Sequence, residues 1–184
     1  MPLSRSKSRH VVRMVTAALA ATSCLSAAAV ISASPASALT WHCKTSERSV
    51  DTANYSGPWA DQYDYTVKQC AARSGSYVYA KASIRWDGPM WANAYTNVWD
   101  GAYYKLMIKE SVSGTDPVLK SQKYYGIESA MEHADSYGNG HYNTGTISYK
   151  IGSAKAVSDG TLYLDWRQCC GGYKAFGFSA SPRV

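Results

Sequence analysis

Side chains that alternate between core and solvent types with a period of two residues constrain the fold of this chain more than any other feature. The alternation is clearest over residues 62–70. There, Tyr63, Tyr65 and Val67 alternate with Asp64, Thr66 and Lys68. Successive side chains of an extended strand point to opposite faces. The pattern therefore predicts a strand with one face in a core and the other in water.

Similar short runs follow along the chain, separated by residues that interrupt strands. Further strands are predicted at residues 77–86, 91–99, 103–110, 118–125, 146–151, 161–167 and 173–181. Turns are predicted at residues 73–75, 87–89, 100–101, 114–117 and 158–160, which contain Gly, Pro or Asp. Residues 127–134 could form two helical turns, and residues 137–141 are read as a loop. Seven to nine short strands predict an all-β fold, namely an antiparallel β-sandwich of immunoglobulin-like or related type.

The first 38 residues have the three parts of a secretory signal peptide. Arg5, Lys7, Arg9 and Arg13 precede an alanine-rich apolar stretch, and the small residues Ala36-Ser37-Ala38 follow it. A membrane anchor is the weaker interpretation, because Thr and Ser residues interrupt the apolar stretch. The leader resembles those of high-GC Gram-positive bacteria. The sequence therefore predicts an extracellular bacterial protein without stable membrane insertion.

Removal of this leader changes the charge of the chain. The full sequence has 19 basic and 13 acidic residues. The leader holds four of the basic residues and no acid, so 15 basic and 13 acidic residues remain, a net charge of +2. A nearly neutral domain has no strong field for phosphates, which argues against a nucleic-acid partner. The remaining chain is read as an irregular N-terminal arm at residues 39–61 and a single β-rich domain at residues 62–184.

Four cysteines follow the leader, and an even number in an exported protein predicts two disulfides. They are Cys43, Cys70, Cys169 and Cys170. Adjacent cysteines in an extended segment point to opposite faces. We therefore favour bonds from Cys43 and Cys70 to one each of Cys169 and Cys170. The alternative is a Cys43–Cys70 bond together with a bond between the two adjacent cysteines.

The sequence carries no recognised catalytic signature. The serine-hydrolase elbow, the zinc-protease helix, the P-loop and the dinucleotide-binding glycines are all absent. A glycosidase-type carboxylate pair would have to come from Asp87, Asp100, Glu110 and Asp165, and none of these is a strong candidate alone. Glu132, His133, Asp135 and His141 could contribute to a metal site, but their spacing matches no zinc signature. We therefore expect a protein that is not an enzyme and has no metal or cofactor.

Aromatic residues are the remaining signal. All 15 Tyr, six Trp and both Phe lie after the leader. A dense group is predicted as a binding surface: Trp86, Trp91, Tyr95, Trp99, Tyr103 and Tyr104. A second group contains Tyr124, Tyr125, Tyr137 and Tyr142. About half of these side chains should fill the core, and the outward half should favour recognition.

These features favour a secreted, non-catalytic protein-binding domain. It would act as an adaptor or accessory subunit of an extracellular assembly, including an antibacterial toxin complex, with another secreted protein as partner. One alternative is an inhibitor of proteases or glycosidases that presents the Cys-Cys-Gly-Gly turn at residues 169–172. The other is a lectin-like module that binds carbohydrate or cell wall by stacking on Trp91 and Trp99.

Overall fold

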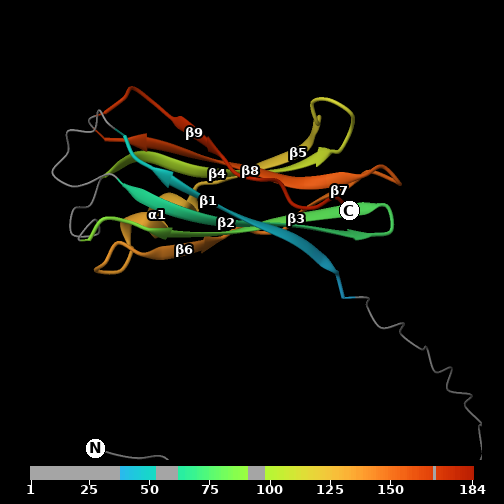
Figure 1. Ribbon diagram of the computed structural model, residues 1–184, viewed down its shortest axis with the longest axis horizontal. Coiled ribbons are helices and arrows are strands. Elements are labelled where there is room, and N and C mark those ends of the chain that lie inside the picture. The colour runs from blue at the N-terminus through green and yellow to red at the C-terminus, as the bar shows by residue number, and fades with distance from the viewer. Residues whose placement is uncertain (1–37, 53–61, 91–97, 168) are drawn as a thin grey trace, which may run out of the picture. The chain divides into compact units, whose positions relative to one another are not determined.

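Strands form where the period-two alternation is found. The computed structural model describes residues 38–52, 62–90, 98–167 and 169–184, which belong to one unit at residues 37–184. Nine strands and one helix lie in these ranges (Figure 1). The strands are β1 Trp41–Val50, β2 Tyr63–Ser74, β3 Tyr77–Asp87, β4 Trp99–Glu110, β5 Val118–Tyr124, β6 Gly140–Asn143, β7 Ile147–Lys150, β8 Ala156–Trp166 and β9 Lys174–Gly177, and the helix is α1 Gly126–Glu132. The prediction of an all-β, antiparallel fold is confirmed.

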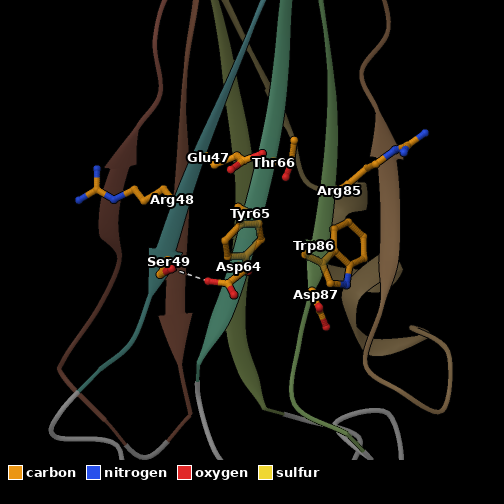
Figure 2. A pocket seen from close by; sticks show the side chains of 9 residues that line it. All are labelled: Glu47, Arg48, Ser49, Asp64, Tyr65, Thr66, Arg85, Trp86 and Asp87. Atoms are coloured by element: carbon orange, nitrogen blue, oxygen red, sulfur yellow. Dashed lines mark hydrogen bonds between the residues drawn. The ribbon is translucent and has the colours of Figure 1, made fainter.

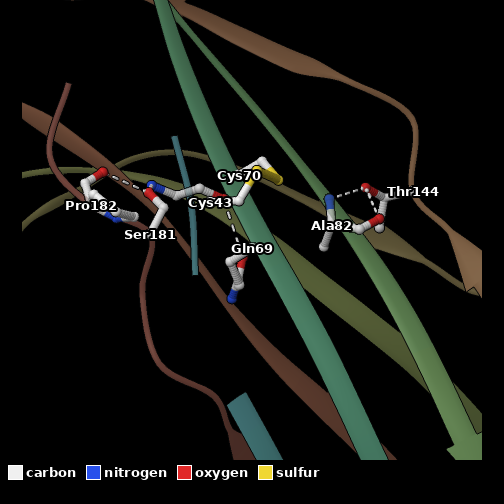
Figure 3. Close-up of a disulfide and its surroundings, with 8 residues drawn as sticks. Cys43, Gln69, Cys70, Ala82, Thr144, Ser181 and Pro182 are labelled. Carbon is white, nitrogen blue, oxygen red and sulfur yellow. Dashed lines mark hydrogen bonds between the residues drawn. A yellow bond between two sulfur atoms is a disulfide. The ribbon is translucent and has the colours of Figure 1, made fainter. Parts of the chain in front are cut away.

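In the first sheet, β2 lies between β1 and β3, and both β6 and β7 pair with β3. β6 pairs with residues 83–86 of β3 and β7 with residues 77–80. Thr144 fills the interval between them (Figure 3). Its N–H donates to the Ala82 carbonyl at 3.0 Å, and its Oγ1 accepts from the Ala82 N–H at 2.8 Å. This residue keeps the two short strands in line along one edge of β3.

The second sheet has the order β5-β4-β8-β9. β4 and β8 pair along their whole length, from Trp99 opposite Trp166 to Glu110 opposite Ala156. The register shifts between Trp99 and Gly101, which is a bulge at the start of β4. This bulge lies next to the candidate site described below.

Inward-facing side chains of both sheets form one hydrophobic cluster. The rings of Tyr63, on β2, and Trp99, on β4, have centroids 5.3 Å apart. Ser158 Oγ, on β8, donates to Gln69 Oε1, on β2, at 3.1 Å, and both residues are fully buried. The two sheets therefore share one core, as the two layers in Figure 1 suggest.

The helix α1 confirms the two helical turns expected near residue 127. Ile127 and Met131 are its buried residues. The Tyr65 hydroxyl donates to Met131 Sδ at 3.3 Å, so the helix packs against the first sheet. Glu128 Oε2 accepts from the Ala102 N–H at 3.0 Å, which joins the helix to β4 of the second sheet.

The N-terminal segment differs from the irregular arm that the sequence predicts. Residues 41–50 form the edge strand β1, and each of them pairs with a residue of β2. Most β1 side chains are exposed or half-buried, so an edge strand accepts a polar sequence that has no clear alternation. The rest of the expected arm, residues 53–61, lies outside the described residues.

Two predicted turns are strand positions in the structure. Residues 158–160 lie inside β8, and Gly101 lies inside β4. A side chain at Gly160 would overlap the Tyr104 hydroxyl and approach Gln69 Nε2 to 2.7 Å. Glycine is therefore needed here to make room for a neighbouring ring, which the sequence alone does not distinguish from a turn. In the predicted loop at residues 137–141, Gly140 and His141 begin strand β6.

The disulfide pairing is the alternative one, so the favoured pairing is wrong. Cys43 and Cys70 are direct partners across β1 and β2, with Cα atoms 4.1 Å apart, and they form a disulfide (Figure 3). Cys169 is bonded to Cys170. The physical reason is the strand β1, whose pairing with β2 places Cys43 directly opposite Cys70.

In the part of the chain that the structure describes, no helix has the length and hydrophobicity required to cross a membrane.

Candidate functional site

A group of aromatic side chains covers the outer face of the second sheet. Tyr103 lies on β4 between Ala102 and Tyr104, both of which belong to the core. Because side chains alternate along a strand, Tyr103 points away from that core. It is nevertheless only 8% exposed. Side chains on the outside of the sheet must therefore cover it.

Four side chains surround the Tyr103 ring. Tyr163, its partner across β4 and β8, stacks on it with ring centroids 4.5 Å apart and an interplanar angle of 12°. Tyr125 lies at 5.3 Å and Tyr173 at 5.0 Å, the latter edge-on. Lys123 Nζ lies 4.6 Å from the centre of the ring, a cation–π geometry. We call these five residues the Tyr103 cluster.

Gly101, at the bulge in β4, makes room for one member of the cluster. A side chain at Gly101 would approach Tyr173 Cζ to 2.8 Å and would overlap its hydroxyl. Tyr173 comes from the connection between β8 and β9, so the glycine lets a distant segment cover the start of β4. This is a tertiary reason for a glycine at position 101, in place of the turn that the sequence indicates.

Charges around the cluster follow from the register of the strands. Lys105 is opposite Lys123 across β4 and β5, so both ammonium groups lie on the same outer face. The nearby Tyr103 and Tyr125 raise the pKa of Lys123. Desolvation, and then the charges of Glu128 and Asp165, raise the pKa of Tyr173. The surface therefore presents tyrosine hydroxyls beside the amino groups of two lysines.

Two rings of the cluster remain accessible at its rim. Tyr125 is 55% exposed and Tyr173 is 47% exposed. Tyr103 is the covered centre, and its neighbours fix the position of its ring. A rigid aromatic centre with an accessible rim is the arrangement expected of a recognition surface.

The connection after β8 approaches the cluster from one side. Cys169 and Cys170 precede Gly171, Gly172 and Tyr173. Cys170 has a φ of 72°, which is unusual for a residue other than glycine. Gly171 and Gly172 also have positive φ values, of 63° and 108°. The chain therefore turns sharply immediately before it places Tyr173.

A second feature is a depression of about 460 Å³ on the outer face of the first sheet (Figure 2). Its polar lining includes Glu47, Ser49, Asp64, Arg85 and Asp87. Asp64 and Asp87 are opposite each other across β2 and β3, and Ser49 Oγ donates to Asp64 Oδ1. Polar groups from three strands thus share one hollow.

The predicted aromatic binding residues lie in different environments. Trp86, Trp99 and Tyr104 are 3%, 4% and 0% exposed and belong to the core, because they point inward from β3 and β4. We therefore do not assign surface binding to them. Tyr103 is the centre of the cluster described above. Trp91 and Tyr95 lie outside the described residues.

The residues considered for a metal site have structural contacts. His133 Nδ1 is 2.7 Å from the Ser129 carbonyl oxygen. Asp135 Oδ1 accepts from the N–H groups of Tyr137 and Asn139 at 2.9 and 2.8 Å, as in an Asx turn. Within the described ranges, no three His, Cys, Asp or Glu side chains are grouped closely enough to hold a metal ion. Glu132 ends α1, and His141 lies on β6 opposite Arg85.

The acidic residues considered for a glycosidase-type pair each have a different structural contact or location. Asp100 forms an ion pair with Arg167 at 3.5 Å. Asp87 lines the depression on the first sheet, and Asp165 contributes to the electrostatic surroundings of Tyr173. Glu110 ends β4, where its N–H donates to the Pro117 carbonyl.

Tyr163, Tyr173 and Lys123 are candidate site residues that sequence reasoning missed. Tyr163 alternates with the core residues Leu162 and Leu164, which is the signal that could have placed it outside. Tyr173 carries no such signal, because its position depends on the turn at residues 170–172. Comparisons of the chain with protein-family models, with curated proteins and with solved structures gave no match.

Proposed function

We propose that this chain is a secreted, non-catalytic protein-binding domain and that the Tyr103 cluster is its recognition surface. The observation that carries the proposal is the burial of Tyr103 by other aromatic residues outside the core. The proposal includes an antiparallel sandwich of immunoglobulin-related type after a cleaved signal peptide. The domain would act as an adaptor or accessory subunit of an extracellular assembly, such as an antibacterial toxin complex.

The physical support is that the cluster is already ordered before a partner binds. The stacking of Tyr103 on Tyr163 fixes two large side chains at the centre of the surface. Binding to fixed rings loses less side-chain entropy than binding to mobile ones. Tyrosine also offers apolar area and a hydrogen-bonding hydroxyl in the same side chain, which suits a protein interface.

Charge indicates the chemistry of the partner. In the described part of the chain, the two ion pairs between side chains are Lys109–Asp159 and Arg167–Asp100. Lys105 and Lys123 take part in neither. Their two cations, beside the hydroxyls of Tyr125 and Tyr173, complement a partner surface that carries carboxylates. Because Glu128 and Asp165 lie near Tyr173, we expect a partner surface with carboxylates opposite the lysines and cations opposite these two acids.

The alternative functions have weaker support. A lectin-like site on Trp91 and Trp99 would need exposed indole rings, but Trp99 is 4% exposed and Trp91 lies outside the described residues. A loop that presents a peptide to a protease adopts an extended conformation, as in strand-addition binding. Cys170, Gly171 and Gly172 all have positive φ, which does not favour that role.

Affinity capture from the culture supernatant of the producing organism tests the proposal. The tagged domain is compared with a Tyr125→Ser/Tyr173→Ser variant, and captured proteins are quantified by mass spectrometry. We expect recovery of the specific partner to fall about tenfold or more, because the variant removes two exposed aromatic contacts, each worth about 1 kcal/mol of binding free energy.

The matched control is a Tyr77→Ser/Tyr137→Ser variant. These tyrosines are 45% and 62% exposed, close to the values of the two cluster residues, but they do not belong to the cluster. Recovery of the partner should be unchanged with this control. Equal recovery with all three proteins would show that the cluster is not the recognition surface. Turnover of a generic substrate by the pure domain would contradict the non-catalytic assignment.

A further inference from the structure

The two disulfides lie in different environments. Cys70 is 5% exposed, and its bond to the half-buried Cys43 joins β2 to the edge strand β1. The Cys169–Cys170 bond lies in the connection between β8 and β9, where Cys170 is exposed. A thiol reagent therefore reaches the second bond more easily than the first, because exchange requires access to a sulfur atom.

The exposed bond is close in sequence to a member of the Tyr103 cluster. Trp166 and Cys169 anchor one end of the connection, because Trp166 is 1% exposed and Cys169 packs against the core. Tyr173 forms the other end, with its ring beside Tyr103 and above Gly101. The backbone between Cys169 and Tyr173 determines whether the tyrosine reaches this position.

The backbone of this connection depends on a left-handed residue that carries a side chain. Cys170 has a φ of 72°, a conformation that L residues other than glycine seldom adopt. Its side chain is bonded to that of Cys169, and the Gly171 N–H donates to the Cys169 carbonyl at 2.9 Å. The covalent bond between neighbouring side chains restricts the backbone at both cysteines. Without this bond, Cys170 is free to return to the common right-handed or extended conformations.

We propose that the Cys169–Cys170 disulfide is a redox-sensitive lock that holds Tyr173 in the Tyr103 cluster. The regulatory meaning of this lock rests on the function proposed above. In the oxidised form, the connection places Tyr173 against Tyr103. In the reduced form, the connection relaxes, Tyr173 leaves Gly101, and the Tyr103 ring loses one of its covering side chains.

The reductant is a dithiol, and the exchange takes place in two steps. One thiolate of the dithiol attacks Sγ of the exposed residue Cys170, the protein S–S bond breaks, and Cys169 leaves as a thiolate that takes up a proton. The second thiol of the dithiol then attacks its own sulfur in the mixed disulfide and releases Cys170 as a thiol. The protein gains two electrons and two protons, and the dithiol becomes a disulfide.

Dithiothreitol titration of the purified protein tests the lock. Free thiols are labelled with a maleimide and assigned by peptide mass spectrometry. Assigned tyrosine ring resonances of the same samples are followed by NMR. We expect Cys169 and Cys170 to be labelled at dithiothreitol concentrations that leave Cys43 and Cys70 bonded. The resonances of Tyr103 and Tyr173 should shift at the same concentrations, while that of Tyr77 on the first sheet stays in place.

Two variants show whether the bond itself holds the tyrosine. Cys169→Ser/Cys170→Ser should have the shifted Tyr103 and Tyr173 resonances without reductant. Cys169→Ser/Cys170→Gly accepts a positive φ at position 170 without a disulfide. It therefore tells whether the backbone conformation alone is sufficient to hold Tyr173 in the Tyr103 cluster. If its resonances match those of the oxidised protein, the bond is not the lock and the proposal fails.

Two other outcomes would also contradict the proposal of a disulfide lock. They are simultaneous reduction of both disulfides, or reduction of Cys169–Cys170 without movement of the Tyr103 and Tyr173 resonances. None of these measurements involves a partner protein. Failure of the lock is therefore distinguishable from failure of the proposed function, which the capture experiment tests separately.

Discussion

Several glycines in the strands lie beneath aromatic rings. Gly160 is close to Tyr104, Gly101 to Tyr173, and a side chain at Gly140 would approach Trp86 Nε1 to 3.1 Å. A ring that lies over a glycine restores part of the packing that the missing side chain would provide. Gly160 and Gly140 are thus packing positions that allow Tyr104 and Trp86 to fill the core, and Gly101 allows Tyr173 to cover the outer face of β4.

Replacement of Gly160 by alanine tests this role. The added methyl group would overlap the hydroxyl of Tyr104, which is fully buried and has little room to move. We expect Gly160→Ala to lower the free energy of unfolding by about 1–3 kcal/mol, as overpacked cores do. Urea denaturation measures this change.

Gly177→Ala is the control for that substitution. Gly177 lies on β9 of the same sheet, and a methyl group there would meet no atom within 4 Å. Its stability should stay within about 0.5 kcal/mol of the parent. A loss of equal size in both variants would mean that glycine acts through strand propensity rather than through space for Tyr104.

At the scale of elements, the strand β1 depends on its pairing with β2. Its side chains contribute little to the core, since Val50 is its one residue in the hydrophobic cluster. The Cys43–Cys70 bond crosses the pair, and Arg48 Nη1 donates to the Gly177 carbonyl at 3.3 Å. Covalent and polar links thus hold an edge strand that burial alone would stabilise weakly.

Removal of the Cys43–Cys70 bond should therefore be costly. The two cysteines are 27 residues apart, and closing a loop of this length restricts the unfolded chain by about 3–4 kcal/mol. We expect Cys43→Ser/Cys70→Ser to lose stability of this order in urea denaturation, with faster amide exchange in β1. Unchanged exchange in β1 would show that backbone pairing alone holds the strand.

At the scale of the whole molecule, tyrosines take core positions between the two sheets. Burial raises the pKa of Tyr65 well above the ordinary value of 10.0, and the neighbouring Tyr63 adds to the effect. Burial, and then the charge of Asp159, raise the pKa of Tyr104. Within the described residues, the Tyr104 hydroxyl has no hydrogen-bond partner, so it keeps its proton chiefly because ionisation in the core is unfavourable.

These shifts predict alkaline destabilisation with a defined sign. The folded state holds the two protons to higher pH than the unfolded chain does. The stabilising contribution is therefore complete below pH 10 and is lost as the pH rises above 10 towards the pKa values of the folded state. In that range, each of the two tyrosines lowers the free energy of unfolding by up to about 1.4 kcal/mol per pH unit.

Tyr104→Phe should reduce this slope by the contribution of one group, as measured by urea denaturation between pH 8 and 11.5. At pH 8 the same variant should be about as stable as the parent, because it removes a hydroxyl that has no partner. An unchanged alkaline slope would mean that Tyr104 does not retain its proton in the folded state above pH 10.

Much of the fold could be predicted from the sequence, because strand alternation is local. The patterns at residues 62–70 and 77–86 correspond to β2 and β3, and the helix near residue 127 was also predicted. Residues without local alternation were predicted poorly, as β1 and the short strand β6 show. Such strands form because a neighbouring strand offers unpaired N–H and C=O groups. The local sequence of the edge strand does not show that such a neighbour is present.

The alternation of Tyr, Trp and aliphatic residues is sufficient to predict that this chain builds antiparallel strands. Which outward-facing aromatic side chains become covered depends on contacts between segments that are distant in the sequence. Tyr103 and Tyr104 point in opposite directions, and alternation places Tyr104 on the face of Leu106 and Tyr103 on the face of Lys105. The second sheet places Tyr104 against the first and leaves Tyr103 outside, where residues from three other segments cover it. Because these covering residues come from distant segments, no local pattern around residue 103 predicts that an outward-facing tyrosine is buried.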